Sequence, residues 1–256
     1  MKKQIPNIFT LLNLFFGCLA IVFALQNGID IIYSKDGEQF VQLKEHICLA
    51  SLFIAIAAVV DFLDGFVARL LDIPTEMGKQ LDSLADVVSF GVAPGIILYQ
   101  FLRMGYIKES DGMEASILWL MPAFLYTCAG AYRLARFNTD TATSFGFKGV
   151  PIPAAGMVIA SLPLINWYSK SDFVNNLILN KWFLYGTILL LSWLMISRLP
   201  ILALKFKDYS LKNNLPKIIL LAIAIVSAIL FKWLAIPVVF IAYIILSLAL
   251  KNKTTT

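Results

Sequence analysis

The chain has 256 residues, of which 59% are hydrophobic and 14% charged, and its apolar residues form continuous runs rather than one helical face. This pattern places the protein in the membrane class and argues against a soluble domain. The formal net charge of +5 requires no nucleic-acid partner, because the basic residues gather in loops where anionic lipid headgroups can neutralise them.

The apolar runs predict an all-α, polytopic transmembrane helical bundle that forms a single membrane domain over residues 1–256. Each run is long enough to cross the hydrocarbon core as a helix, and Lys, Asn, Gly and Pro mark the connections. The last two runs are split only by Lys232, so they form either a tight hairpin or one long kinked span, and their combined length favours two crossings. The eight expected spans are 7–26, 47–68, 82–102, 115–135, 151–168, 179–197, 216–231 and 233–250.

Basic residues orient these spans. With eight crossings, both termini and the loops near 69–81, 136–150 and 198–215 lie on one side, which carries most of the 21 Lys and Arg residues. Because positive charge is retained in the cytoplasm, we expect both termini to be cytoplasmic in a protein of the inner membrane.

The second and third expected spans carry four aspartates near their cytoplasmic ends. Asp61 and Asp64 lie three residues apart, and Asp82 and Asp86 lie four apart, so each pair shares one face of its helix. A short turn between antiparallel helices brings the two faces together, and the four carboxylates then converge on one pocket. Such a cluster requires a cation, because repulsion and lost hydration cost many kcal/mol in a partly desolvated site.

An all-oxygen ligand set without His or Cys favours Mg²⁺ or Mn²⁺, with Ca²⁺ as an alternative at one position. Two such ions about 4 Å apart form a clamp for phosphoryl chemistry. Arg69 supplies one positive charge nearby, while Asp72, Glu76 and Lys79 are expected in a solvated turn. In the alternative interpretation the aspartates are ordinary helix-end charges, with Asp82 as a cap, but acidic groups inside a membrane are expensive and usually functional.

The stretch DFLDGFVARLLDIPTEMGKQLDSLAD (61–86) resembles the full signature of the CDP-alcohol phosphatidyltransferase family, with no departure at any position. The resemblance implies the transmembrane helical fold of that family. It also implies an enzyme that displaces CMP from a CDP-linked lipid or alcohol with the help of a divalent metal. The signature consists of the four aspartates together with Gly65, Ala68, Arg69 and Gly78.

Further stretches look like the family's CDP-diacylglycerol–serine phosphatidyltransferases, which implies transfer of a phosphatidyl group from CDP-diacylglycerol to L-serine. Relatives that make phosphatidylglycerophosphate usually show a pattern like DPxADK around the third and fourth aspartates, where this chain has Ser83 and Val87. The similarity covers the catalytic helices at about 5–160, whereas the additional C-terminal helices at about 179–250 match only in hydrophobic character. The stretches are IPNIFTLLNLFFGCLAI (5–21), DSLADVVSFGVAP (82–94), YRLARFN (132–138) and GVPIPAAG (149–156).

The resemblance also implies a role for each aspartate. Asp61, Asp64 and Asp82 hold the metals that grip the CDP diphosphate. Asp86 contributes to the metal site and is the general base that removes the proton from the serine hydroxyl. CMP then leaves to the cytoplasm, and phosphatidylserine stays in the bilayer.

Other positions are expected to bind substrate. By resemblance, Gly65, Ala68, Arg69 and Gly78 frame the nucleotide phosphates. Small residues there let a pyrophosphate approach the backbone closely. Asn7, Thr10 and Asn13 are spaced by three along the first span, and they either hydrogen-bond the cytidine and order the pocket or join two helices.

Two arginines lie at the inner end of the fourth span. Arg133 and Arg136 are three residues apart and are expected to meet the lipid phosphate or the serine carboxylate. The alternative is that both snorkel to the membrane interface. Ser89 and Gly91, one turn beyond Asp86, either shape the acceptor pocket or pack helices.

Two alternatives remain open from the sequence. The acceptor could be glycerol 3-phosphate, inositol or its phosphate, although the 69–90 stretch offers only Arg69 and Lys79 to bind an additional phosphate. A cation transporter would also use intramembrane carboxylates, but such proteins often have inverted repeats, and here the acidic motif occurs only once. The expected partners are CDP-diacylglycerol, L-serine, CMP and membrane lipids, and the resemblance implies a homodimer.

Overall fold

The computed structural model describes residues 5–26, 29–33, 39–43, 45–71, 76–108, 116–139, 147–202 and 211–249. Helices dominate, because a hydrocarbon environment leaves backbone groups no partners other than those within the same helix. The helices are α1 (Ile5–Leu25), α2 (His46–Leu71), α3 (Glu76–Asp86), the π-helix η2 (Val87–Val92), α4 (Ala93–Ile107), α5 (Ile117–Leu120), α6 (Ala123–Thr139), α7 (Ile152–Tyr168), α8 (Asp172–Ile178), α9 (Lys181–Ile196), α10 (Leu211–Phe231), the 3₁₀-helix η4 (Lys232–Leu234) and α11 (Ala235–Ala249).

The predicted helical fold class is confirmed, with two small antiparallel strand pairs added to it. β1 (Ile29–Tyr33) pairs with β2 (Gln39–Leu43) between α1 and α2. β3 (Phe147–Lys148) pairs with β4 (Pro200–Ile201), which links the start of α7 to the end of α9. The sequence analysis predicted neither pair.

Each of the eight expected spans coincides with a helix or a pair of helices, but the count of eight stays a prediction. By length and composition, four described stretches can cross a membrane: Pro6–Leu25, His46–Val67, Glu76–Ile107 and Asn214–Ala249. The pair α8 and α9, which is bent by 62°, makes a fifth if it is one span. These apolar helices fit an integral membrane protein.

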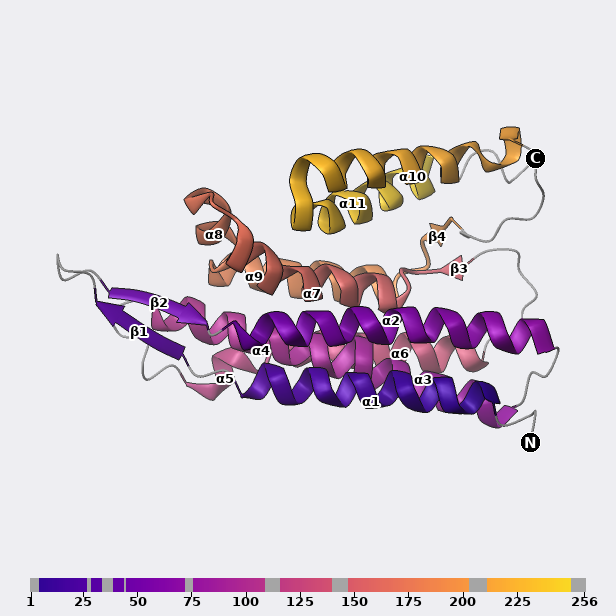
Figure 1. Ribbon diagram of the computed structural model, residues 1–256, viewed down its shortest axis with the longest axis horizontal. Helices are drawn as coiled ribbons and strands as arrows, with labels where there is room; N and C mark the ends of the chain where they lie inside the picture. Colours follow the sequence, from indigo (N-terminus) through magenta and orange to yellow (C-terminus); the bar gives the residue numbers. More distant parts are fainter. Residues whose placement is uncertain are drawn as a thin grey trace.

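The last stretch folds back on itself. Lys232 has a φ of 51°, a left-handed conformation that reverses the chain between α10 and α11. The two helices lie side by side in Figure 1 and contact each other. The structure therefore favours the hairpin over a single kinked span.

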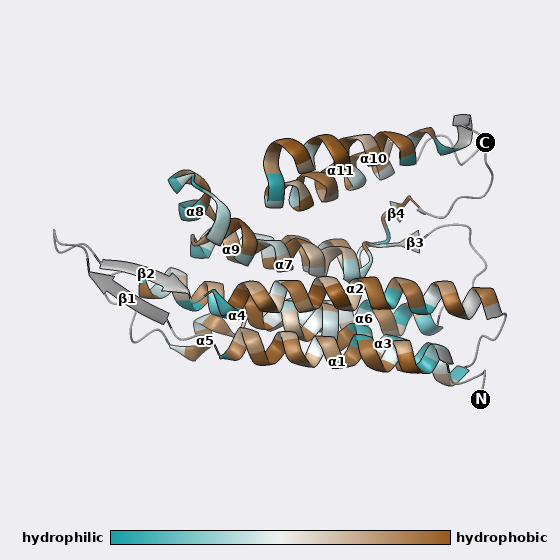
Figure 2. Ribbon diagram, in the orientation of Figure 1, coloured by the Kyte–Doolittle hydropathy of each residue, from teal (hydrophilic) through white to brown (hydrophobic). Residues whose placement is uncertain are grey.

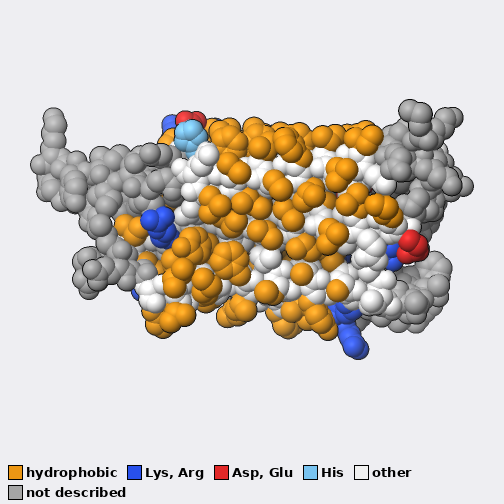
Figure 3. Space-filling model, turned by 90° about the horizontal axis from the view of Figure 1, so that it is seen from below, with side chains coloured by type: hydrophobic (Ala, Val, Ile, Leu, Met, Phe, Trp, Pro, Cys, Tyr) orange, Lys and Arg blue, Asp and Glu red, His pale blue; other side chains and the backbone are white. Residues whose placement is uncertain are grey.

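The helices stack in layers (Figure 1): α1 to α6 form one group, α7 and α9 lie above it, and the α10–α11 hairpin lies above them. Figure 2 shows hydrophobic residues along most of each helix, with hydrophilic residues concentrated on parts of α3 and α6 and at helix ends. On the face drawn in Figure 3, hydrophobic side chains cover the middle, and the coloured charged side chains lie toward the two ends. This distribution suits helices whose outer surfaces face lipid.

The third span begins earlier than expected. Helix α3 starts at Glu76, so Gly78, Lys79 and Asp82 all lie within it, and the expectation that Glu76 and Lys79 belong to a loop is wrong. The apolar-run criterion missed this segment because it is polar, although Glu76 in the first turn suits the positive end of the helix dipole. It also follows that Asp82 does not cap a helix. Asp72 lies outside the described residues.

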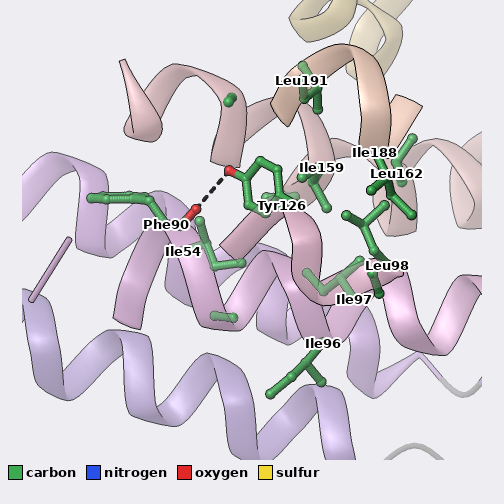
Figure 4. Close-up of a cluster of buried hydrophobic side chains, with 14 of the residues drawn as sticks. Ile54, Phe90, Ile96, Ile97, Leu98, Tyr126, Ile159, Leu162, Ile188 and Leu191 are labelled. Atoms are coloured by element: carbon green, nitrogen blue, oxygen red, sulfur yellow. Dashed lines mark hydrogen bonds between the residues drawn. The ribbon is translucent and has the colours of Figure 1, made fainter. Parts of the chain in front are cut away.

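A π-helix directly follows Asp86, and its residues Ser89, Phe90 and Gly91 are buried in the core. Its irregular turn leaves carbonyls that need other donors, and α6 supplies them. The Tyr126 hydroxyl donates to the Phe90 carbonyl at 2.8 Å, and Thr127 Oγ1 donates to the Gly91 carbonyl at 2.9 Å. Figure 4 shows Tyr126 and Phe90 among buried aliphatic side chains from several helices, including Ile54 and Ile159. The end of α3 that carries Asp86 is therefore anchored in well-packed core.

Candidate active site

Helices α2 and α3 bring three aspartates together. One carboxylate oxygen each from Asp61, Asp82 and Asp86 lies within 4.8 Å of the others. Asp64 is one turn beyond Asp61 on α2 and stands outside this set of three. The expected convergence of the two helix faces is thus observed for three of the four residues, with Asp64 beside them.

Helix α1 contacts two of these carboxylates. The Thr10 hydroxyl donates a hydrogen bond to Asp64 Oδ2, and Asn13 Nδ2 donates to Asp86 Oδ1 at 3.5 Å. Both α1 side chains are buried, and Asn13 Oδ1 accepts no hydrogen bond from the described residues. Thr10 and Asn13 therefore orient carboxylates, which favours the interpretation that they order the pocket. Asn7 lies half-buried on the same helix, one turn before Thr10.

Close approach of α1 to the π-helix makes these bonds possible. A Cβ at Gly17 would overlap the Ser89 side chain and lie 2.9 Å from its Cα atom. Ser89 Oγ also donates to the Asn13 carbonyl at 3.0 Å, one turn before Gly17. Gly17 thus allows the contact that places Asn13 beside Asp86. The sequence analysis missed this glycine, whose only signal is its place in an otherwise bulky apolar helix.

The carboxylate cluster fits a divalent cation. Asp64 and Asp86 are each 7% exposed, and Asp61 and Asp82 are half-buried. Among the side chains that the structure describes, only Arg133 offsets the charge of the three clustered aspartates, and it does so through Asp86, so a single positive charge there faces three carboxylates. Hard carboxylate oxygens at this separation suit Mg²⁺ or Mn²⁺.

The two arginines on α6 have different surroundings. Arg133 is 6% exposed, its Nε has no hydrogen-bond partner, and it interacts electrostatically with Asp86. Arg136 instead donates to the Ile196 carbonyl at 2.7 Å and to the Ser197 carbonyl at 3.3 Å, which caps the carboxyl end of α9. Burial argues against snorkelling for Arg133, while Arg136 is engaged with the protein itself.

The remaining expected positions lie on or next to the same helices. Gly65 follows Asp64 on α2 and is half-buried, and Gly78 is half-buried in the first turn of α3. Ala68 and Arg69 lie on α2, but their side chains are outside the described part of the chain. The Gly91 carbonyl accepts from Thr127, and a Cβ added at Gly91 would come within 3.4 Å of Ile152 and 3.7 Å of Thr127, so Gly91 lies against α6 and α7 and the packing interpretation is favoured over an acceptor pocket.

A polar contact between α3 and α6 was not predicted. Asn138 Nδ2 donates to Ser83 Oγ at 2.7 Å, and Lys79 Nζ donates to the Asn138 carbonyl at 3.4 Å. These bonds tie the end of α6 to the turn of α3 that carries Asp82. The sequence feature that could have indicated this contact is Ser83, a polar residue next to Asp82.

Comparison with known proteins adds independent information. The sequence matches the CDP-alcohol phosphatidyltransferase family over residues 3–202. It is 35% identical over 223 residues to the CDP-diacylglycerol–serine O-phosphatidyltransferase of Helicobacter pylori (strain J99), covering 86% of this chain and 81% of the relative. It is 32% identical over 248 residues to the protein of the same name from Mycobacterium bovis, covering 93% and 75%. It is also 31% identical over 169 residues to the archaetidylserine synthase of Methanothermobacter thermautotrophicus, covering 65% and 60%.

Proposed function

Because the chain belongs to the CDP-alcohol phosphatidyltransferase family, we propose that it transfers a phosphatidyl group from CDP-diacylglycerol to L-serine, giving phosphatidylserine and CMP. Two relatives that align over most of both chains are named for this reaction. The observation that carries the proposal onto this chain is the cluster of Asp61, Asp82 and Asp86, with the buried Arg133 interacting with Asp86. The family is dependent on divalent cations, which agrees with the chemistry of the cluster.

Asp61, Asp64, Asp82 and Asp86 are the proposed ligands of Mg²⁺ or Mn²⁺, and the number of carboxylates suits two ions. When bound, such cations neutralise the CDP diphosphate and stabilise negative charge on the transferred phosphoryl group. Thr10 holds one oxygen of Asp64 and thereby fixes the orientation of that carboxylate. Gly65, Ala68, Arg69 and Gly78 are proposed to frame the nucleotide phosphates next to this set.

Asp86 is the proposed general base. Asn13 donates to its Oδ1, and no described residue donates a hydrogen bond to Oδ2, which is the proposed acceptor of the proton of the serine hydroxyl. The serine oxygen forms a bond to the phosphorus that bears diacylglycerol, and the bond from this phosphorus to the bridging oxygen of CMP breaks. CMP leaves with the bonding electrons, and the proton passes from Asp86 to water.

Arg133 is proposed to bind the serine carboxylate. The hydroxyl and the carboxylate of serine are separated by only two carbon atoms, so the base and the cation that bind them must be neighbours, as Asp86 and Arg133 are. A guanidinium also binds a carboxylate through paired hydrogen bonds. Inositol offers no anionic group to Arg133, and this difference favours serine over inositol as the acceptor.

The site is proposed to face the cytoplasm. The Ile5 end of α1 and the Ala249 end of α11 lie at the same end of the bundle (Figure 1), which is also the end where α2 finishes and α3 begins. Basic residues in the connections at this end support a cytoplasmic orientation in the inner membrane. We propose a homodimer on the basis of family membership alone.

One assay tests the proposal. Purified protein is incubated with CDP-diacylglycerol, Mg²⁺ or Mn²⁺, and serine, glycerol 3-phosphate or inositol in turn, and the lipid products are identified by mass spectrometry. We expect phosphatidylserine from the serine reaction and its loss in Asp86→Asn. Phosphatidylglycerophosphate or phosphatidylinositol as the main product would assign another acceptor. Cation flux across liposomes without CMP release would favour the transporter.

A further inference from the structure

The start of α3 and the end of α6 are joined by three polar residues, Lys79, Ser83 and Asn138, which we call the α3–α6 bridge. Asn138 Nδ2 donates to Ser83 Oγ at 2.7 Å, and Ser83 Oγ donates to the Lys79 carbonyl at 3.1 Å. Lys79 Nζ in turn donates to the Asn138 carbonyl at 3.4 Å, so the three hydrogen bonds form a closed cycle. Ser83 and Asn138 are half-buried, which strengthens the bond between them relative to one in water.

A second anchor joins the same part of the chain to α6, deeper in the core. The Tyr126 hydroxyl donates to the Phe90 carbonyl at 2.8 Å, in η2. The two anchors show that α6 runs antiparallel to α3 and η2, so Asp86 and Arg133 both lie between them along their own helices. Arg133 follows Tyr126 by two helical turns and therefore shares its face of α6.

The interval between the two anchors holds a buried cation. Arg133 is 6% exposed, and its Nε has no hydrogen-bond partner among the described residues. Its Cζ lies 5.9 Å from the centre of the Phe137 ring, and Phe137 directly precedes Asn138. The last turn of α6, which the bridge ties to α3, thus contacts Arg133.

We propose that Asn138 is a positioning residue that, through Ser83, sets the spacing between α6 and α3 and thereby fits the site to an acceptor of the size of serine. The inference rests on the proposed function, in which serine joins Asp86 on α3 to Arg133 on α6. Serine is too short to follow if the helices move apart, and a misplacement of 1 Å costs about 100-fold in rate. Without the bridge, the last turn of α6 is held mainly by its own helix and is free to fray.

Three variants test this role. Asn138→Ala and Ser83→Ala each remove the 2.7 Å hydrogen bond, whereas Thr139→Ala is a matched control, because the Thr139 hydroxyl donates to the Ala135 and Arg136 carbonyls of its own helix. We expect either bridge variant to raise KM for serine about 5-fold, with KM for CDP-diacylglycerol unchanged. Thr139→Ala should keep both values at the wild-type level.

Acceptor selectivity separates positioning from general stability. L-threonine carries one more methyl group than serine, so a wider site should accept it better. The ratio of kcat/KM for serine to that for threonine should fall about 5-fold in Asn138→Ala and in Ser83→Ala. Ser83→Thr keeps the hydroxyl and should restore the preference for serine that Ser83→Ala loses.

A double-mutant cycle links the two residues. Because a single hydrogen bond joins them, Ser83→Ala combined with Asn138→Ala should have the effect of one variant alone. Additive effects, or a lower temperature of unfolding in detergent with an unchanged ratio of serine to threonine use, would overturn the inference. The wild-type protein reports on the proposed function separately. If it forms no phosphatidylserine, the proposed function fails, whereas wild-type activity with unaltered selectivity in Asn138→Ala removes only the role of the bridge.

Discussion

Gly17→Ala tests the link between helix packing and the candidate base. The added Cβ would lie 2.9 Å from the Ser89 Cα atom, where ordinary contact begins at 3.4 Å, so α1 must retreat by about 0.5 Å. Asn13 sits one turn away and bonds Asp86 at 3.5 Å, so any retreat of α1 breaks this hydrogen bond. A backbone atom cannot rotate away, unlike the end of a flexible side chain.

Two effects follow from this retreat. Overpacking of this kind costs about 1–3 kcal/mol of unfolding free energy. A misplacement of 1 Å costs about 100-fold in rate, so a shift of half that size should reduce kcat about 10-fold. Gly186 on α9 offers a matched control, because a Cβ there meets nothing within 4 Å. The free energy of unfolding of Gly186→Ala should therefore rise by up to about 1 kcal/mol, because alanine has the higher helix propensity, and its activity should be normal.

The assay compares thermal unfolding in detergent with CMP release from CDP-diacylglycerol and serine for both variants. The propensity gain is common to the two substitutions, so the difference between them isolates the clash with Ser89. If Gly17→Ala matched Gly186→Ala in both measurements, the close approach of α1 would play no part in placing Asn13. The claim that Gly17 holds Asn13 beside Asp86 would then be wrong.

Other predictions concern the same site and its support. Asp86→Asn should abolish CMP release while thermal unfolding stays near wild type, and normal turnover in this variant would refute the base assignment. Chelation with EDTA should remove activity that Mg²⁺ or Mn²⁺ restores, as followed by CMP formation; full activity in EDTA would count against a metal at the cluster. Arg133→Lys should raise KM for serine at least about 10-fold, since charge-assisted hydrogen bonds contribute about 1.5–3 kcal/mol, whereas Arg136→Lys should lower stability and leave KM unchanged. Tyr126→Phe should cost about 1–3 kcal/mol of unfolding free energy, because the buried Phe90 carbonyl loses its donor, and an unchanged melting temperature would contradict that reasoning.

Local spacing predicted the features that depend on one or two neighbouring helices. Spacing by three or four puts Asp61 and Asp64 on one face of α2 and Asp82 and Asp86 on one face of α3, and the few residues between these helices in the sequence predict that the two faces meet, as Asp61 and Asp82 do. Apolar runs likewise located the helices, since lipid requires long hydrophobic segments. The search for apolar runs did not find the start of α3 at Glu76, because polar residues near a membrane surface can form a helix without forming an apolar run.

Features that depend on distant parts of the chain could not be predicted in the same way. Arg133 and Arg136 look equivalent in the sequence, yet one interacts with Asp86 and the other caps α9, because only tertiary packing decides what each meets. The Tyr243 hydroxyl of α11 donates to the Leu202 carbonyl, a hydrogen bond that spans a hairpin and a connection, and no local pattern encodes it. Asn13 was placed on the correct helix face, whereas its partner Asp86 emerged only from the structure.

The π-helix at Val87–Val92 fits one more residue into the turn between α3 and α4 than α-helical winding would hold. An α-helix advances by about 100° per residue, so winding the same residues as regular α-helix would rotate α4 relative to Asp82 and Asp86. Side chains such as Phe101 and Leu102, now in the core, would then turn toward the acyl chains. The wide turn thus lets α4 present its apolar face to the core while α3 presents its carboxylates to the site.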